Sequence, residues 1–115
     1  MAQLINETGK SIIVEKLEVA DSFFKRLKGL LGKESMEDGT ALWIRNANSI
    51  HTFFMKFEID VMFLDKNLKV KKCIQGVKPN EIIWPIWGAR SVVEMKAGHL
   101  KKINVTVGDQ LHVVH

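Results

Sequence analysis

The stretch that most restricts the fold is 51–65, where polar side chains recur at alternate positions of a densely apolar run. The polar positions are Thr52, Lys56, Glu58 and Asp60, and between them lie Phe53, Met55, Phe57, Ile59, Val61 and Phe63. A period of two is typical of a β-strand with one buried and one partly polar face. We therefore expect either one long strand or two shorter strands broken near 56–58. The run is too short to span a bilayer, which needs about 20 residues.

Several other segments have the composition and turn chemistry of short strands. They are 3–7 and 11–18, joined by Thr8-Gly9-Lys10, then 41–45, 69–77 and 91–96, and a closing hairpin formed by 103–107 and 111–113. The segment 84–88 contains Pro85, which lacks a backbone donor, so we expect a loop or sheet edge there. One segment changes period: the apolar residues of 21–31 follow the spacing of a helix.

These elements predict a mainly β fold with one α-helix at about 21–31. Seven to nine short strands that do not alternate with helices favour a compact antiparallel β-sandwich or barrel. The 115 residues fit one domain over 1–115, and 46% hydrophobic with 26% charged residues is ordinary for a globular protein. We expect no membrane span.

Charge and cysteine content restrict the kinds of site and the cellular compartment that we expect for the protein. Residues 66–102 hold nine Lys or Arg and only two acidic residues, Glu81 and Glu94, a net charge of +7. The whole chain has a net charge of +4, so the rest of it is net negative and the basic character is regional. Cys73 is the single cysteine, so an internal disulfide and a multi-cysteine zinc site are excluded. No signal peptide is visible at the start of the sequence, and we expect a cytoplasmic location.

Ordered blocks along nearly the whole chain resemble one known family. They lie at 26–33, 51–65, 88–95, 97–98 and 108–109, and they are similar to the domain of unknown function (DUF) family 192. The resemblance implies a compact, mainly β domain and implies no established reaction. The sequence departs from the family pattern at Glu58, in a place often held by proline. We also expect no leader segment of the kind that some relatives carry.

Two ionisable residues stand out as candidate site residues. His51 opens the central stretch beside a polar break at 46–49, and Asp60 lies between Ile59 and Val61, where burial would require a partner. One hypothesis places both at one end of a sheet as a proton-handling or ligand-orienting pair. The other is a structural network in which Asp60 accepts hydrogen bonds from Arg90, Arg26 or backbone amides.

The aromatic pair Trp84 and Trp87 also allows two interpretations. The rings form either the wall of a pocket or a plug over an open end of the sheet. Together with Lys69, Lys71 and Lys72 they suggest binding of single-stranded nucleic acid, although lysines on a strand also prevent edge pairing.

The remaining reactive residue types give weaker hypotheses. Cys73 lies among lysines that could lower its pKa, but a lone cysteine more often fills a core. Glu94 is expected to be an exposed strand residue or a partner of Arg90. His112 and His115 would point to opposite faces of a strand, and we predict no metal site and no cofactor.

Three functions follow from these residues. The first is a non-enzymatic binding module for a small polar or anionic ligand, held by His51, Thr52, Asp60, Arg90, Trp84 and Trp87. The second is a small enzyme that uses His51 or Asp60 as an acid or base. The third is single-stranded nucleic-acid binding through 66–102. No complete catalytic constellation is visible, so the sequence favours a non-enzyme, and it does not predict an oligomeric state.

Overall fold

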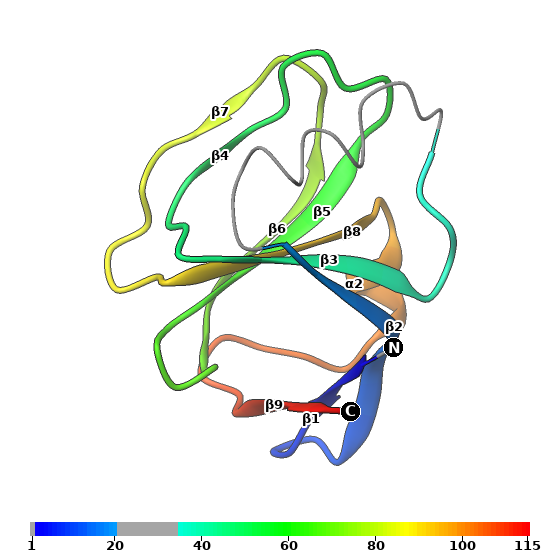
Figure 1. Cartoon of the computed structure of the whole chain (residues 1–115), viewed down its shortest axis with the longest axis vertical. Coiled ribbons are helices and arrows are strands. Elements are labelled where there is room, and N and C mark those ends of the chain that lie inside the picture. The colour runs from blue at the N-terminus through cyan, green and yellow to red at the C-terminus, as the bar shows by residue number, and fades with distance from the viewer. Residues whose placement is uncertain (1, 21–34) are drawn as a thin grey trace.

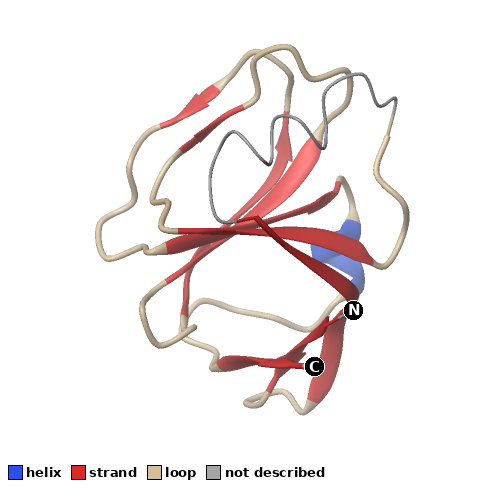
Figure 2. Cartoon of the chain, in the orientation of Figure 1, coloured by secondary structure: helices blue, strands red, loops and turns tan. Residues whose placement is uncertain are grey.

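Short β-strands form most of the molecule (Figures 1 and 2). The computed structural model describes residues 2–20 and 35–115. The elements in these ranges are β1 (Ala2–Asn6), β2 (Ser11–Ala20), β3 (Thr40–Arg45), β4 (Ile50–His51), β5 (Ile59–Leu64), β6 (Val70–Val77), β7 (Ile82–Ile83), β8 (Ser91–Lys96), α2 (His99–Lys102) and β9 (Leu111–Val114). Within the described ranges, no helix has the length and apolar character needed to cross a membrane.

Seven of the strands form one mixed sheet in the order β6-β5-β8-β3-β2-β1-β9, and β4 pairs with β7 as a separate two-stranded ribbon. All described pairings are antiparallel except β2–β3, which is parallel. The two strands are far enough apart in sequence for the long crossover that parallel neighbours need. Lys69 and Gln110, which directly precede the edge strands β6 and β9, form one isolated bridge, and no ladder between these two strands closes the sheet in the described ranges. The prediction of a mainly β, sandwich-like fold is confirmed, and the sheet is not a closed barrel.

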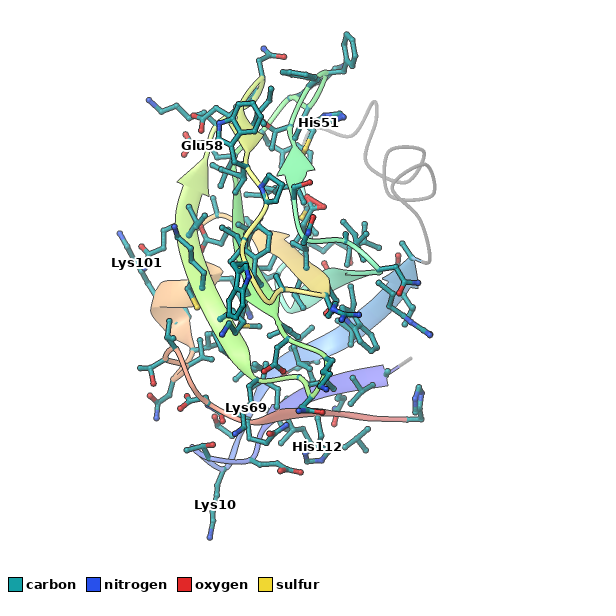
Figure 3. The ribbon with its side chains drawn as sticks, turned by 90° about the vertical axis from the view of Figure 1, so that its left-hand side faces the viewer. Lys10, His51, Glu58, Lys69, Lys101 and His112 are labelled. Atoms are coloured by element: carbon teal, nitrogen blue, oxygen red, sulfur yellow. The ribbon has the colours of Figure 1, made fainter. Side chains whose placement is uncertain are left out.

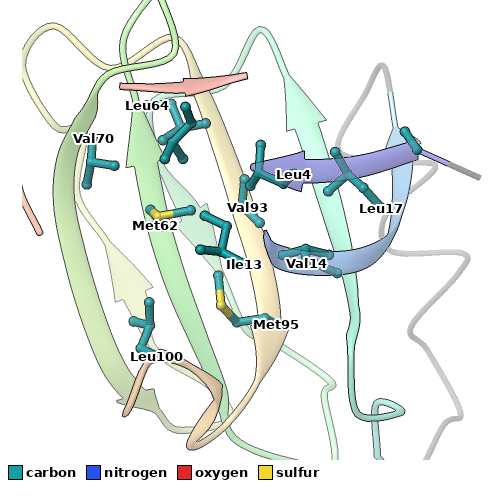
Figure 4. Packing of buried hydrophobic residues seen from close by; sticks show 13 residues of the cluster. Leu4, Ile13, Val14, Leu17, Met62, Leu64, Val70, Val93, Met95 and Leu100 are labelled. Carbon is teal, nitrogen blue, oxygen red and sulfur yellow. The ribbon is translucent and has the colours of Figure 1, made fainter. Parts of the chain in front are cut away.

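Two apolar clusters lie on opposite faces of the central strands β5 and β8. The first core, shown in Figure 4, comprises Ala2, Leu4, Ile13, Val14, Leu17, Ala41, Met62, Leu64, Val70, Val93, Met95, Leu100 and Leu111. The second core comprises Met36, Ile50, Met55, Ile59, Val61, Phe63, Val77, Ala89 and Val92. Every residue of β5 is buried, so the strand has no polar, solvent-facing side.

Most of the local strand predictions are confirmed. The first two strands form the expected hairpin, and strands occur at 40–45, 70–77 and 91–96, with turns at 66–67 and 97–98. The segment 84–88 is a loop, as Pro85 indicated. The helix predicted over 21–31 lies outside the described residues, and the short helix α2 was not predicted.

The single long strand over 51–65 does not form, and the alternative of two shorter strands is confirmed, with a longer break than expected. His51 ends β4, β5 begins at Ile59, and 52–58 forms a turn in which Phe54 has a φ of +68°. The closing hairpin does not form either, since 103–107 is irregular and β9 pairs with β1 instead. Ile103 and Val105 still pack against the first core, so their alternation reflects burial without strand pairing.

Candidate functional site

A groove of about 800 Å³ lies between two arms of the chain, 46–53 and 82–90. The described residues that line it are Asn46, Ala47, Asn48, Ser49, Ile50, His51, Phe53, Ile82, Ile83, Trp84, Pro85, Ala89 and Arg90. Figure 3 shows His51 on this part of the molecule, far from the lower region around Lys69 and His112. The volume falls within the range of small-molecule sites, about 300–1,000 Å³.

Backbone pairing holds the two arms side by side. At one end, β4 and β7 pair Ile50 with Ile83 and His51 with Ile82. Farther along, the Ile86 amide donates to the Asn48 carbonyl at 2.9 Å. At the other end, the Ala47 amide donates to the Arg90 carbonyl at 3.0 Å. The arms therefore run antiparallel along the whole groove.

The groove rests on the second core, which fixes its floor. Ile50 and Ala89 are buried members of that core, and Ile83 packs against it. The Arg90 amide also donates to the carbonyl of Leu64, the last residue of β5, at 2.8 Å. Both arms are thus attached to the most buried strand of the sheet, while the upper surfaces of the arms face solvent.

His51 has a defined orientation at the aromatic end of the groove. Its ring stacks on Phe53 with centroids 4.7 Å apart and an interplanar angle of 27°. Its Nδ1 atom accepts a hydrogen bond from the Phe53 amide at 3.3 Å, so a neutral ring carries its proton on Nε2. The geometry makes His51 part of a flat aromatic wall.

Thr52 was predicted to bind ligand, and the structure places it in the protein interior. Its side chain is fully buried, and its hydroxyl donates to the Lys78 carbonyl and accepts from the Glu81 amide at 2.9 Å. Its own amide and carbonyl bond to Glu81 and Asn80. These bonds join the end of β4 to the loop before β7, which ends the strand and explains why 52–58 turns.

Asp60 is also fully buried, and backbone amides surround its carboxylate. Oδ1 accepts from Gly76 at 2.9 Å, and Oδ2 accepts from Gly98 and Leu100, both at 3.0 Å. These bonds connect β5 to β6 and to the first residues of α2. The sequence suggested Arg90, Arg26 or backbone amides as partners of Asp60, and within the described ranges backbone amides bond to it.

The predicted pairing of His51 with Asp60 does not form. Asp60 alternates with Ile59 and Val61, which belong to the second core beneath the groove, so its side chain lies on the opposite face of β5. Arg90 lies beside the far end of the same strand, at Leu64. The structure brings His51 and Arg90 to the groove and leaves Asp60 outside it.

The two tryptophans occupy different positions, and neither forms a plug. Trp84 lines the groove and is 73% exposed. Trp87 is 90% exposed and is not among the described lining residues, and the Lys71 Nζ atom lies 6.0 Å from its ring centroid. The plug interpretation is wrong because both rings face solvent.

The basic region 66–102 does not form one surface. Lys71 lies by Trp87, and Arg90 lines the groove. Lys96 pairs with Asp38 at 3.5 Å, and Lys101 and Lys102 lie on α2, whose Leu100 belongs to the first core. The chain thus distributes its positive charge over several faces.

Glu94 and Cys73 differ from their sequence-based interpretations. Glu94 is fully buried between β3 and β5, opposite Leu42 and Val61, because β8 is a central strand; the prediction of an exposed position is wrong. Burial raises the pKa of the Cys73 thiol, and the nearby negative charge of Asp109 raises it further. Cys73 packs against the first core, as expected for a core filler.

Two of the histidines outside the groove, His99 and His112, lie beside oxygen atoms of distant segments. His99 Nε2 lies 2.7 Å from the Ile13 carbonyl oxygen, and His112 Nδ1 lies 2.7 Å from the Glu7 carboxylate. Among residues 2–20 and 35–115, no three His, Cys, Asp or Glu side chains come together in a way that could hold a metal ion.

Sequence reasoning missed most of the groove. The ribbon strand β7 and the lining residues Phe53, Ile82 and Ile83 were not proposed as site residues. The available signal was the β-branched Ile50 after the break 46–49, and the pair Ile82-Ile83 before Trp84-Pro85. Two short β-branched segments beside loops are compatible with a small ribbon, but nothing local shows that they pair.

Comparison with known proteins agrees with the fold. The model of the family DUF192, described as an uncharacterized ACR, matches residues 4–113. A UPF0127 protein of Pyrococcus horikoshii is 34% identical over 111 residues, covering 94% of this chain and 96% of its own. A UPF0127 protein of Pyrococcus abyssi is 36% identical over 118 residues, covering 96% and 97%.

Two solved structures are similar in fold. A putative transcription regulator from Sinorhizobium meliloti has a TM-score of 0.76 at 19% identity, covering 97% of this chain and 91% of its own. A protein of unknown function from Novosphingobium aromaticivorans has a TM-score of 0.77 at 14% identity, covering 96% and 82%. At these identities the similarity is one of fold.

Proposed function

This chain belongs to the DUF192 family, and from that premise we propose that it is a non-enzymatic binding module whose groove takes a small anionic ligand. One observation carries the proposal. Arg90 is exposed and lines the groove, and none of the described lining residues is Asp or Glu. A guanidinium can bind a carboxylate or phosphate with two parallel hydrogen bonds.

The remaining lining supports this chemistry. Asn46, Asn48 and Ser49 supply side chains that can donate hydrogen bonds, and Ile50, Ile83 and Trp84 supply apolar surface. A few polar groups within a mostly apolar concave surface is the usual composition of a small-molecule site. Thr52 and Asp60, which the sequence proposed as further ligand residues, act within the fold.

A thermal-shift screen against small carboxylates and phosphates tests the proposal. At least one anion is expected to raise the unfolding temperature of the wild type in a concentration-dependent way, because a ligand that binds only the folded state stabilises it. The shift is expected to disappear in Arg90→Ala and to persist in Arg45→Ala. Arg45 is a matched control because its guanidinium lies over Trp43, which packs against the first core, 5.8 Å from the ring centroid. An equal loss in both variants contradicts a role for the groove.

Single-stranded nucleic-acid binding is a second candidate, favoured by the exposed Trp87 ring beside Lys71. Aromatic rings stack on bases, and lysines neutralise phosphates. Fluorescence anisotropy with a labelled single-stranded oligonucleotide at low salt is expected to show binding that weakens steeply as salt rises. Absence of binding at low salt contradicts this candidate.

The enzyme hypothesis loses its proposed pair, because His51 of β4 lines the groove above the second core, whereas the Asp60 side chain lies on the other face of β5. A cytoplasmic location stays a prediction, consistent with a single, partly buried cysteine.

A further inference from the structure

The pairing register gives the groove a direction. Ile50 pairs with Ile83 at one end, and the Ala47 amide bonds to the Arg90 carbonyl at the other. Position 50 is three steps along the chain from position 47, so the two ends are at most about 10 Å apart, the reach of a fully extended chain at about 3.3 Å per residue. The lining changes in chemistry over this distance.

The end at β4 and β7 is flat and aromatic. The stacked rings of His51 and Phe53 lie on one arm, and Trp84 and Ile82 lie on the other. Trp84 is 73% exposed and Ile82 is 47% exposed, so both present apolar surface to solvent. A planar apolar group placed between the arms would remove this surface from water, at about 25 cal/mol for each Å² buried.

The opposite end is polar and basic. Arg90 and Asn46 lie there across the two arms, next to the small side chain of Ala89. The described lining contains no carboxylate that would compete for the guanidinium. An anionic group is therefore favoured at this end, and an apolar group at the other.

Building on the proposed function, we propose that the ligand is an amphiphilic anion: a planar aromatic ring held beside Trp84 and the His51–Phe53 stack, joined to a carboxylate or phosphate held by Arg90 within about 10 Å. A bare inorganic anion would leave the aromatic end exposed to water. A neutral ring would leave Arg90 without a counter-charge. A ligand that joins a ring to an anionic group matches the change from aromatic to basic lining along the two arms.

Isothermal titration calorimetry on the full chain separates these alternatives. 3-(2-Naphthyl)propionate and adenosine monophosphate represent the carboxylate and phosphate forms of the ligand class. 3-(2-Naphthyl)propanamide lacks the charge, while propionate and inorganic phosphate lack the ring. At least one ring-bearing anion is expected to bind at least tenfold more tightly than its neutral or ring-free counterpart, and the stronger of the two identifies the anionic group.

Two pairs of matched variants locate the binding. Trp84→Ala is expected to weaken the ring-bearing anion at least tenfold, whereas Trp87→Ala, an exposed tryptophan outside the described lining, leaves it unchanged. Arg90→Ala is expected to weaken it at least tenfold, whereas Arg45→Ala leaves it unchanged. All four variants are expected to unfold near the wild-type temperature, because the substituted tryptophans and arginines have exposed or half-exposed side chains.

The outcomes distinguish this inference from the proposed function. Arg90-dependent binding of propionate or inorganic phosphate with the same affinity as the ring-bearing anions overturns the inference and leaves the proposed function standing. Binding that is insensitive to Trp84→Ala does the same. A wild type that binds no member of a broad anion panel overturns both.

Discussion

Asp60 and Arg90 lie near opposite ends of β5 and show how differently one strand treats two charged residues that the sequence placed in a single site. Asp60 is fully buried and accepts three backbone hydrogen bonds from β6, the turn after β8, and α2. Arg90 is exposed and borders the groove, and only its backbone is tied to β5. A polar residue among apolar neighbours is therefore either a bonded part of the interior or a surface group available to a ligand.

The two regions also differ in what would change if a residue were replaced. In the interior, Asp60 and Thr52 bond to backbone groups that have little access to water, so replacing either residue should lower the free energy of unfolding. In the groove, exposed side chains contribute little to folding, so replacing them should weaken ligand binding and leave the stability nearly unchanged. Stability measurements therefore test the comparison directly.

The largest effect is expected at Asp60. Asp60→Ala leaves three backbone amides without their acceptor, and we expect the free energy of unfolding to fall by about 3–5 kcal/mol. Asp60→Asn retains one oxygen and should cost about 1–3 kcal/mol. Urea denaturation followed by circular dichroism measures both losses.

Asp65→Asn is the matched control for Asp60. Asp65 also accepts two backbone amides, from Asn67 and Lys69, but in an exposed turn that asparagine favours as well. We expect a change within about 0.5 kcal/mol. If Asp60→Asn lowers the free energy of unfolding no more than Asp65→Asn does, the three backbone hydrogen bonds to Asp60 do not stabilise the sheet. Asp60 would then again be a candidate for function.

A smaller loss is expected at Thr52, the buried neutral member of the interior group. Thr52→Val keeps the shape of the side chain and removes the hydroxyl that bonds to Lys78 and Glu81. Leaving those groups unpaired should lower the free energy of unfolding by about 1–3 kcal/mol, and Thr52→Ser should restore most of it. The readout is again urea denaturation.

Thr40→Val provides the comparison for that substitution. The Thr40 hydroxyl donates to the Glu37 carbonyl at 2.7 Å in an exposed turn, where water can replace it. We expect a change within about 0.5 kcal/mol. Equal losses of unfolding free energy at Thr40 and Thr52 would show that burial does not decide how much a threonine hydroxyl contributes to stability.

Sequence alone predicted those parts of the fold that depend on near neighbours. The first hairpin follows from the turn 8–10 between two apolar runs, and the 84–88 loop follows from Pro85. The local sequence pattern does not predict a break directly after His51, because Thr52 bonds to residues that lie 26 and 29 positions away in the sequence. A period of two is compatible with a strand and with this turn.

The candidate site divides in the same way. His51, Trp84 and Arg90 line the groove, as the sequence proposed, because exposed polar and aromatic residues gather on loops around a small ribbon. Asp60 was misplaced because its partners lie 16, 38 and 40 residues away, and nothing in the sequence shows which face of β5 meets them. Long-range backbone bonding decided which polar residues became structural.

The smallest effect concerns Asp109, whose Oδ2 atom accepts a hydrogen bond from the side chain of the fully buried Asn6 at 2.8 Å. Hydrogen bonds from the Thr106 amide and the Asn6 side chain lower its pKa below the usual value, despite some opposing desolvation. A carboxyl whose pKa is lower in the folded state contributes stability above its unfolded pKa, about 3.9, and loses that contribution as the pH falls through the folded value. We expect the stability difference between wild type and Asp109→Asn to be constant from pH 5 to 7 and to narrow below about pH 4. Urea denaturation across this range measures the difference. A difference that stays constant into strong acid would mean that the hydrogen bonds from Thr106 and Asn6 do not stabilise the Asp109 carboxylate on folding.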